Sequence, residues 1–377
     1  MWRGRQALSD GKYAQAIENF NVLTRLDTTS YWGFFFRGIA KYNLGDLRGA
    51  DTDFSTSVRL NPVFTNGYHY LGITKSRFGE YDEAYKDFRK ALELRPGQYG
   101  IYFSRGVTSF LAQKFQDAVQ DFDTYIKKEP KDPTAYLNRG ASYLFLKDTV
   151  KALSDYDLAI KLDRFDPEGY IRRARVRSDR KEFKEALSDL DKAIELDSSS
   201  TFAYFNRALI RYELKDYNSA MSDLNTVLRH EPGNALTLYN RSLIYAQVGA
   251  YEDALEDMDR VIGINPGNVL AHFNRAAIFI EMGRWNDALL DYNRAIELYP
   301  DFAKAYLNRS YVENMLGRTR ESKADYRTAQ DKIREYKEKS GSSEFADTTR
   351  KYSSLLALDA DFAKKDFDNE LLQHRDI

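Results

Sequence analysis

The sequence contains no cysteine, which excludes disulfide bonds, thiolate metal sites and a cysteine nucleophile. No apolar run approaches the roughly 20 residues that a membrane-spanning helix needs, and residues 1–10 lack the apolar core of a signal peptide. An excess of one charge is also missing, because 56 Lys and Arg residues are balanced by 57 Asp and Glu residues. Without a basic bias, we expect no nucleic-acid partner and no direct membrane insertion.

Proline is scarce, with eight residues in 377, but its spacing is regular. Six of the prolines form two series with a step of 34 residues: Pro62, Pro96 and Pro130, then Pro232, Pro266 and Pro300. A fixed period of this length indicates a repeat architecture. When Tyr31 is taken as repeat position 1, nine full repeats cover residues 31–336 and a partial repeat covers residues 1–30.

Three repeat positions show how each unit folds. Positions 8 and 20 hold Gly, Ala or Ser in all ten repeats, whereas position 24 is always large and apolar. This pattern predicts two antiparallel helices per repeat, because small side chains allow close approach and the large one fills the space beside them. Position 15 is Gly in six repeats, and it falls where a helix C-terminus favours a left-handed residue.

These positions, together with an aromatic residue at 17 and Pro at 32, resemble the tetratricopeptide repeat over residues 1 to about 336. The Tyr-Leu-Asn-Arg-Gly run at 136–140 resembles bacterial members. The resemblance implies an all-α, right-handed superhelix of about ten helix pairs, whose concave groove usually holds a peptide or partner. The expected full repeats are 31–64, 65–98, 99–132, 133–166, 167–200, 201–234, 235–268, 269–302 and 303–336.

A C-terminal extension is expected over residues 337–377, with a capping helix from about 347 to 365. At the other end, Met1 falls at repeat position 5, inside a first helix. We therefore expect a trimmed chain whose upstream residues are missing. If those residues held a signal, the compartment would be a bacterial envelope, and otherwise the cytoplasm.

Two charged columns recur through the repeats. Position 7 is Arg in eight of the nine full repeats, and position 23 is Asp in all nine. Because the two helices of a repeat pack together, we predict Arg–Asp ion pairs between them. The alternative is that the arginines form a track for a polyanion.

Position 6 is an asparagine column in the later repeats, although Asn is unfavourable inside helices. By family geometry this position faces the groove, where an amide can donate to and accept from a peptide backbone. Such a column resembles the asparagine ladder of family members that hold extended peptides. The alternative is that each Asn bonds a neighbouring helix. The predicted residues are Asn138, Asn206, Asn240, Asn274 and Asn308.

Neighbouring positions extend this predicted peptide site. Position 5 is apolar in most repeats, and Phe205, Tyr239 and Phe273 are expected to contact apolar side chains of the ligand. Arg172 and Arg175 lie on one helical face with acidic residues four positions away. They are candidates to hold a carboxylate or phosphate, or else they pair within their own helix.

The start of the second repeat is an aromatic block over residues 31–36. One packing face cannot bury residues that fan out around a helix. We therefore expect Trp32, Phe35 and Phe36 to be covered by something apolar, either a partner segment or another copy of the chain. Closure by the superhelical coil alone is the alternative.

No motif supports catalysis. The sequence lacks the His-Glu-x-x-His, Gly-x-Gly-x-x-Gly and phosphate-binding-loop patterns, and its four histidines follow no repeat position. We predict a scaffold with no enzymatic activity, no catalytic residue, no metal and no cofactor, which binds an extended segment of a partner protein. The alternatives are a self-associating structural element, which makes a homo-oligomer a possible state, and a regulatory region of a larger enzyme.

Overall fold

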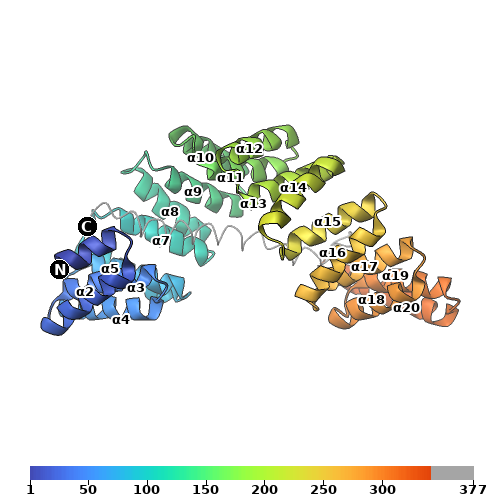
Figure 1. Cartoon of the computed structure of the whole chain (residues 1–377), viewed down its shortest axis with the longest axis horizontal. Helices are drawn as coiled ribbons and strands as arrows, with labels where there is room; N and C mark the ends of the chain where they lie inside the picture. The colour runs from blue at the N-terminus through green and yellow to red at the C-terminus, as the bar shows by residue number, and fades with distance from the viewer. Residues whose placement is uncertain (341–377) are drawn as a thin grey trace. The chain divides into compact units, whose positions relative to one another are not determined.

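The computed structural model describes residues 1–340, in two compact units over residues 1–176 and 177–340. Within these residues there are twenty α-helices and no strand. Each helix from α1 to α10, and each from α12 to α20, packs against its neighbour in the chain (Figure 1). The predicted capping helix lies outside the described residues. The predicted all-α repeat fold is confirmed for residues 2–340.

Unit 1 holds α1 to α10, and α11 crosses the division between the units. The helices are α1 (Trp2–Ser9), α2 (Tyr13–Leu26), α3 (Tyr31–Asn43), α4 (Leu47–Leu60), α5 (Thr65–Arg77), α6 (Tyr81–Leu94), α7 (Gly100–Leu111), α8 (Phe115–Ile126), α9 (Pro133–Phe145), α10 (Thr149–Leu162) and α11 (Pro167–Asp179).

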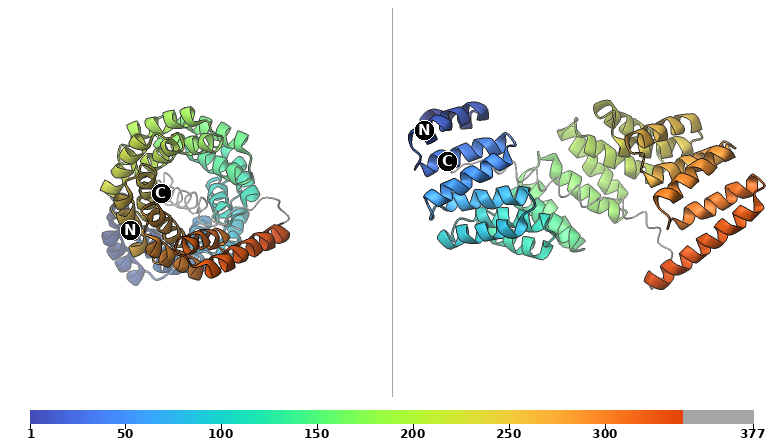
Figure 2. Two further views of the ribbon diagram at one scale, coloured as in Figure 1. Left: turned by 90° about the vertical axis from the view of Figure 1, so that its right-hand side faces the viewer. Right: turned by 90° about the horizontal axis from the view of Figure 1, so that it is seen from below.

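Unit 2 continues the same alternation of helices. Its helices are α12 (Phe183–Leu196), α13 (Thr201–Glu213), α14 (Tyr217–His230), α15 (Ala235–Gln247), α16 (Tyr251–Ile264), α17 (Val269–Glu281), α18 (Trp285–Leu298), α19 (Ala303–Met315) and α20 (Thr319–Ser340). With 22 residues, α20 is longer than its partner α19 and extends beyond it (Figure 2).

The contact between position 8 and position 24 closes each helix pair. A Cβ atom added to Gly38 would lie 2.7 Å from the Phe54 ring, and one added to Gly72 would lie 2.7 Å from the Phe88 ring. Both rings are completely buried. Since real Cβ atoms do not approach so closely, the Phe54 and Phe88 rings as placed here require glycine opposite them. In repeat 269–302, Ala276 stands opposite the ring of Tyr292, and both are buried. In unit 2, Ala208 stands opposite the smaller Leu224, and both are buried.

The turn between paired helices has the predicted left-handed residue at position 15. Gly45 has φ +81°, and the amide of Asp46 donates to the carbonyl of Lys41 at 2.9 Å, five residues back across the helix end. Four repeats hold the same conformation without glycine: Gln113, Lys147, Lys181 and Lys215, with φ between 59° and 63°.

The aromatic block in α3 is covered from within unit 1. Phe35 and Phe36 are only 1% and 2% exposed. The Phe36 ring stacks on Phe20 of α2 and on Trp32, whereas Phe35 packs edge-on against Phe64 at 4.9 Å. The burial of these two rings therefore needs no second molecule. Trp32 remains partly exposed, and its contact with a partner stays a prediction.

Candidate binding face on the first helices of unit 2

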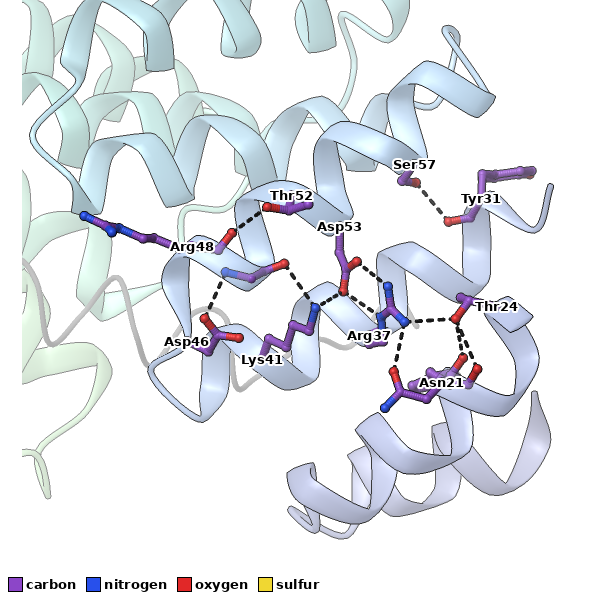
Figure 3. Close-up of polar contacts among 12 residues, drawn as sticks. Asn21, Thr24, Tyr31, Arg37, Lys41, Asp46, Arg48, Thr52, Asp53 and Ser57 are labelled. Atoms are coloured by element: carbon purple, nitrogen blue, oxygen red, sulfur yellow. Dashed lines mark hydrogen bonds and ion pairs between the residues drawn. The ribbon is translucent and has the colours of Figure 1, made fainter. Parts of the chain in front are cut away.

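The predicted Arg–Asp pairs form in seven repeats and fix the two helices of each pair. In the second repeat, Nε and Nη2 of Arg37 donate to Asp53 at 2.8 and 2.7 Å, and Lys41 lies 2.8 Å from the same carboxylate (Figure 3). The other pairs are Arg105–Asp121, Arg139–Asp155, Arg207–Asp223, Arg241–Asp257, Arg275–Asp291 and Arg309–Asp325.

Six of these seven arginines, all except Arg105, also reach back to the second helix of the preceding repeat, at position 25, and Arg173 makes the same contact. Nη1 of Arg139 donates to Asp123 at 2.6 Å, and Nη1 of Arg37 donates to Asn21 at 2.9 Å. Each of the six therefore joins three helices. The sequence analysis missed this acceptor because position 25 is not uniform: it is Asp or Asn at most junctions, but Ser55 and Arg89 at two others. The remaining acceptors are Asp157, Asp191, Asn225, Asp259 and Asn293.

Two buried aspartates of position 23 have pKa shifts in opposite directions. Burial raises the pKa of Asp121, which has the single cationic partner Arg105. Burial also acts on Asp291, but hydrogen bonds from Arg275 and His272 together lower its pKa below the ordinary value. These pairs hold the helices in register and consume donors that a polyanion would need.

The asparagines of the column in unit 2 belong to α13, α15, α17 and α19, and their side chains are half-buried. In three cases the amide nitrogen donates to the carbonyl four residues earlier: Asn206 to Phe202 at 2.8 Å, Asn240 to Leu236 at 2.8 Å and Asn274 to Leu270 at 3.0 Å. Within residues 1–340, no hydrogen bond reaches the Oδ1 atoms of these three. Each thus keeps an acceptor and, for Asn206 and Asn240, a second N–H.

Aromatic side chains lie beside these amides. The hydroxyl of Tyr239 accepts a hydrogen bond from Asn274 of the next repeat at 2.5 Å, and burial raises the pKa of Tyr239 to about 12. Phe273 and Phe205 are likewise half-buried. We call these six residues the open face of unit 2: Phe205, Asn206, Tyr239, Asn240, Phe273 and Asn274.

Asn308 stands apart from the other members of its column. Its amide donates to the hydroxyl of Tyr292 at 3.2 Å, and Tyr292 is completely buried at position 24 of the preceding repeat. This hydrogen bond directs the Asn308 amide toward the core. Part of its donor capacity is therefore already used inside the repeats.

The corresponding positions of unit 1 are closed. Position 6 of α3, α5, α7 and α9 holds Phe36, Tyr70, Ser104 and Asn138, none of which is more than 4% exposed. The amide of Asn138 donates to the Thr134 carbonyl at 3.0 Å. The first helices of unit 1 contact one another directly, as α5 and α7 do, and they leave these side chains no open face.

The two candidate arginines of α11 differ in their surroundings. Arg172 is 5% exposed, its Nε donates to Glu168 at 2.8 Å, and its Nη1 donates to the Leu137 carbonyl at 3.3 Å. The predicted alternative of pairing within the helix is thus present for Arg172. Arg175 is partly exposed, with a buried Nε that makes no hydrogen bond.

Residues 1–340 contain neither a cluster of metal ligands nor a candidate membrane span. No group of three or more His, Asp or Glu side chains among residues 1–340 is placed to hold a metal ion. Over the same residues, every helix is too short or too polar to cross a bilayer.

Comparisons with known proteins agree on the fold. Tetratricopeptide repeat models match residues 66–98, 110–167, 205–269 and 269–302. The APC/C hetero-tetramer Cut9–Hcn1 is similar at 13% identity and TM-score 0.53, over 79% of this chain and 59% of that one. Yeast Tom70 is similar at 15% identity and TM-score 0.46, over 96% and 94%.

A further similar structure is YrrB, described as a TPR protein with an unusual peptide-binding site, at 21% identity and TM-score 0.43, over 49% of this chain and 95% of that one. No protein in the curated comparison matches the sequence. The helix pairs, the close packing of positions 8 and 24 and the matched models all point to one assignment. The chain belongs to the tetratricopeptide repeat family.

Proposed function

We propose that unit 2 binds an extended segment of a partner protein along its open face. The family assignment supports a scaffold for protein interactions in general. The observation that carries the finer proposal is the difference between the units. The same repeat positions are buried in unit 1 but half-buried in unit 2, where amides with spare hydrogen-bonding groups alternate with aromatic rings.

The amides are suited to a peptide backbone. Each residue of an extended chain presents one N–H and one C=O, and Asn206 and Asn240 each offer the complementary acceptor and donor from a fixed helix. Their existing hydrogen bond to the carbonyl four residues earlier orients the side chain. A rigid amide loses little conformational entropy on binding, which favours affinity without dependence on the ligand sequence.

The aromatic rings would supply the apolar contacts. Phe205, Tyr239 and Phe273 lie one repeat apart from each other. The Phe273 ring packs against the Phe302 ring, with a centroid distance of 4.7 Å. Half-buried aromatic residues on a preorganised surface are the usual anchors of protein interfaces. We therefore expect a ligand with apolar side chains, an extended conformation and no required charge.

The test is selection of unstructured peptides from a random library on the full chain, followed by affinity measurement with the triple variant Asn206→Ala/Asn240→Ala/Asn274→Ala. If each lost hydrogen bond costs about 0.5–1.5 kcal/mol, the triple variant should bind the selected peptides at least tenfold more weakly. Because Ala has a higher helix propensity than Asn, the variant should remain folded.

The matched control is Asn43→Ala in α3, because the Asn43 amide also bonds the carbonyl four residues earlier, Ile39 at 2.9 Å, but lies in unit 1. It should leave the affinity unchanged. Equal binding by the triple variant and the wild type would refute the proposal, and so would undiminished binding of selected peptides whose backbone N–H groups have been methylated.

A further inference from the structure

A cavity of about 570 Å³ lies between α14, α15 and α16 of unit 2, and none of the six open-face residues lines it. Three arginines from three helices line it: Arg229, Arg241 and Arg260. Among the described residues that line it there is no carboxylate, whereas Ser222 and Asn225 add polar groups. The site therefore concentrates positive charge in a chain whose overall charge is nearly balanced.

One carboxylate behind the cavity neutralises part of this charge. Asp257, which is 2% exposed, accepts from Nε and Nη2 of Arg241 at 2.7 Å each, and Nη1 of Arg260 lies 3.8 Å from it. Counting the lining residues and this direct partner, three guanidinium groups face one carboxylate, an excess of about +2. The exposed Glu256 also acts on Arg241, but it does not line the cavity. At this junction the position-25 acceptor is the neutral Asn225, where four other junctions have Asp, so the second carboxylate is missing.

The guanidinium groups are oriented yet not saturated. Three of the five N–H groups of Arg241 are used by Asp257 and Asn225, which leaves two. Arg260 donates to the Pro232 carbonyl at 2.6 Å, and Arg229 donates to the hydroxyl of Thr226 at 2.8 Å. Arg229 has no carboxylate within 4.0 Å in the described chain. Preorganised arginines with spare donors match the oxygens of an anion.

The repeat fold does not account for Arg229 and Arg260. Arg229 occupies position 29, which is Glu195 one repeat earlier and Gly263 one repeat later. Arg260 occupies position 26, which is Thr226 one repeat earlier. Helix stacking therefore does not require cations at these two positions. Cations recur at position 29 in Arg25, Arg59, Lys127 and Lys161 and at position 26 in Lys90, Lys192 and Arg294, but only the junction of Arg229, Arg241 and Arg260 has arginine at all three positions.

We propose that this cavity binds a dianionic phosphate group. A local charge of about +2 matches a phosphate monoester better than a single carboxylate, and its three terminal oxygens suit donors that come from three helices. The volume is in the range of pockets that take small ligands. The site is separate from the open face, so it can be present whether or not that face binds a peptide.

The experiment is isothermal titration calorimetry of the full chain with three probes: inorganic phosphate, a phosphoserine peptide and its unphosphorylated counterpart. We expect the phosphate-bearing probes to bind and the unphosphorylated peptide not to bind. A phosphopeptide that binds at least tenfold more tightly than inorganic phosphate would identify a phosphorylated chain as the source. Equal affinities would identify a free phosphate compound. Failure of both phosphate-bearing probes to bind would overturn the proposal.

The variant is Arg229→Gln/Arg260→Gln, and it should lower the affinity for phosphate at least tenfold while the unfolding midpoint stays the same. Arg294→Gln is the matched control, because Arg294 occupies position 26 of the next repeat but does not line the cavity. It pairs instead with Glu297 at 3.1 Å. It should not change phosphate binding. Equal loss in the control and the double variant would indicate nonspecific surface charge and contradict the site. Arg229→Gln alone, which removes only a contact to Thr226, repeats the test if the double variant unfolds.

Discussion

At the residue scale, the buried aspartates of position 23 show that an ion pair does not by itself favour the charged carboxylate. Burial penalises the carboxylate of Asp121, and the single cation Arg105 does not fully offset that penalty. Asp291 has a second donor in His272, and its pKa is lowered. One additional hydrogen bond therefore reverses the preference, as expected when desolvation and pairing nearly cancel.

This reversal predicts opposite pH dependences for two substitutions. Because the folded pKa of Asp291 is lowered, its stabilising contribution is present above the unfolded value of about 3.9 and is lost as pH falls through the folded pKa. The folded pKa of Asp121 is raised, so its contribution is present below about 3.9 and is lost as pH rises through the folded pKa. The advantage of wild type over Asp291→Asn should therefore grow with pH, and its advantage over Asp121→Asn should shrink.

The measurement is the thermal unfolding midpoint of wild type and both variants between about pH 2.5 and 5, followed by far-UV circular dichroism. The slope of each difference against pH is the observable, since Asn does not titrate and constant packing effects cancel. Slopes of the same sign for the two variants would show that the second donor does not control Asp291.

Several residue-scale features could be predicted from the sequence because they depend on one repeat alone. Gly45 needs its left-handed conformation for a turn that every repeat makes, and the Arg37–Asp53 pair joins two helices of the same repeat. The burial of the Phe36 ring could not be predicted in the same way. It depends on the positions of Phe20 and Trp32 after packing, which residue spacing does not determine.

At the element scale, the glycine and the aromatic ring that pack two helices together form a matched pair. Adding a methyl group at Gly72 would place it 2.7 Å from the completely buried Phe88 ring. We expect Gly72→Ala to destabilise unit 1 by roughly 1–2 kcal/mol, because overpacking outweighs the gain in helix propensity. Phe88→Leu should also destabilise it, because it leaves a cavity.

The double variant Gly72→Ala/Phe88→Leu reproduces the Ala208 and Leu224 combination of unit 2. Its loss of unfolding free energy should be smaller than the sum of the two single losses by about 1 kcal/mol or more. Chemical denaturation midpoints measure this coupling. Gly263→Ala in α16 is the control, because nothing lies within 4 Å of the added Cβ atom, and it should stabilise by roughly 0.5–1 kcal/mol. Strict additivity of the pair would contradict the steric explanation.

Element packing also explains why the candidate site was predicted only in part. The repeat period gives Asn138 and Asn206 the same position, yet Asn138 is 2% exposed and Asn206 is half-buried. Exposure of a first helix depends on the side chains of neighbouring repeats, such as Arg172, which reaches the Leu137 carbonyl. The arginine-lined cavity was not predicted at all, because positions 26 and 29 alternate between cations and other residues, and the spacing does not show which of these cations line one cavity.

At the scale of the whole molecule, stability in a repeat protein is close to a sum of repeat and nearest-neighbour terms. The arginine links between successive repeats are therefore local contributions, and two of them are missing in unit 1. At one junction Leu71 replaces the arginine, and at the next the arginine has no acceptor. Arg105 pairs with Asp121, but position 25 of the preceding repeat is the exposed Arg89 instead of an acceptor. At the next junction, Arg139 reaches Asp123 at 2.6 Å.

Replacing Arg89 with Asp should supply the missing acceptor at the α6–α7 junction. We expect a stabilisation of up to about 1 kcal/mol, because the new partner is solvent-exposed and such pairs are weak. Hydrogen exchange followed by mass spectrometry should show slower exchange in α6, α7 and α8 and no change in α16 to α19, since the coupling extends only to neighbouring repeats. Arg89→Ala separates the removal of a like charge from the gain of an ion pair, and only Arg89→Asp should lose its effect at high salt. Slower exchange throughout both units would show that the chain responds as one cooperative body, which nearest-neighbour stacking does not allow.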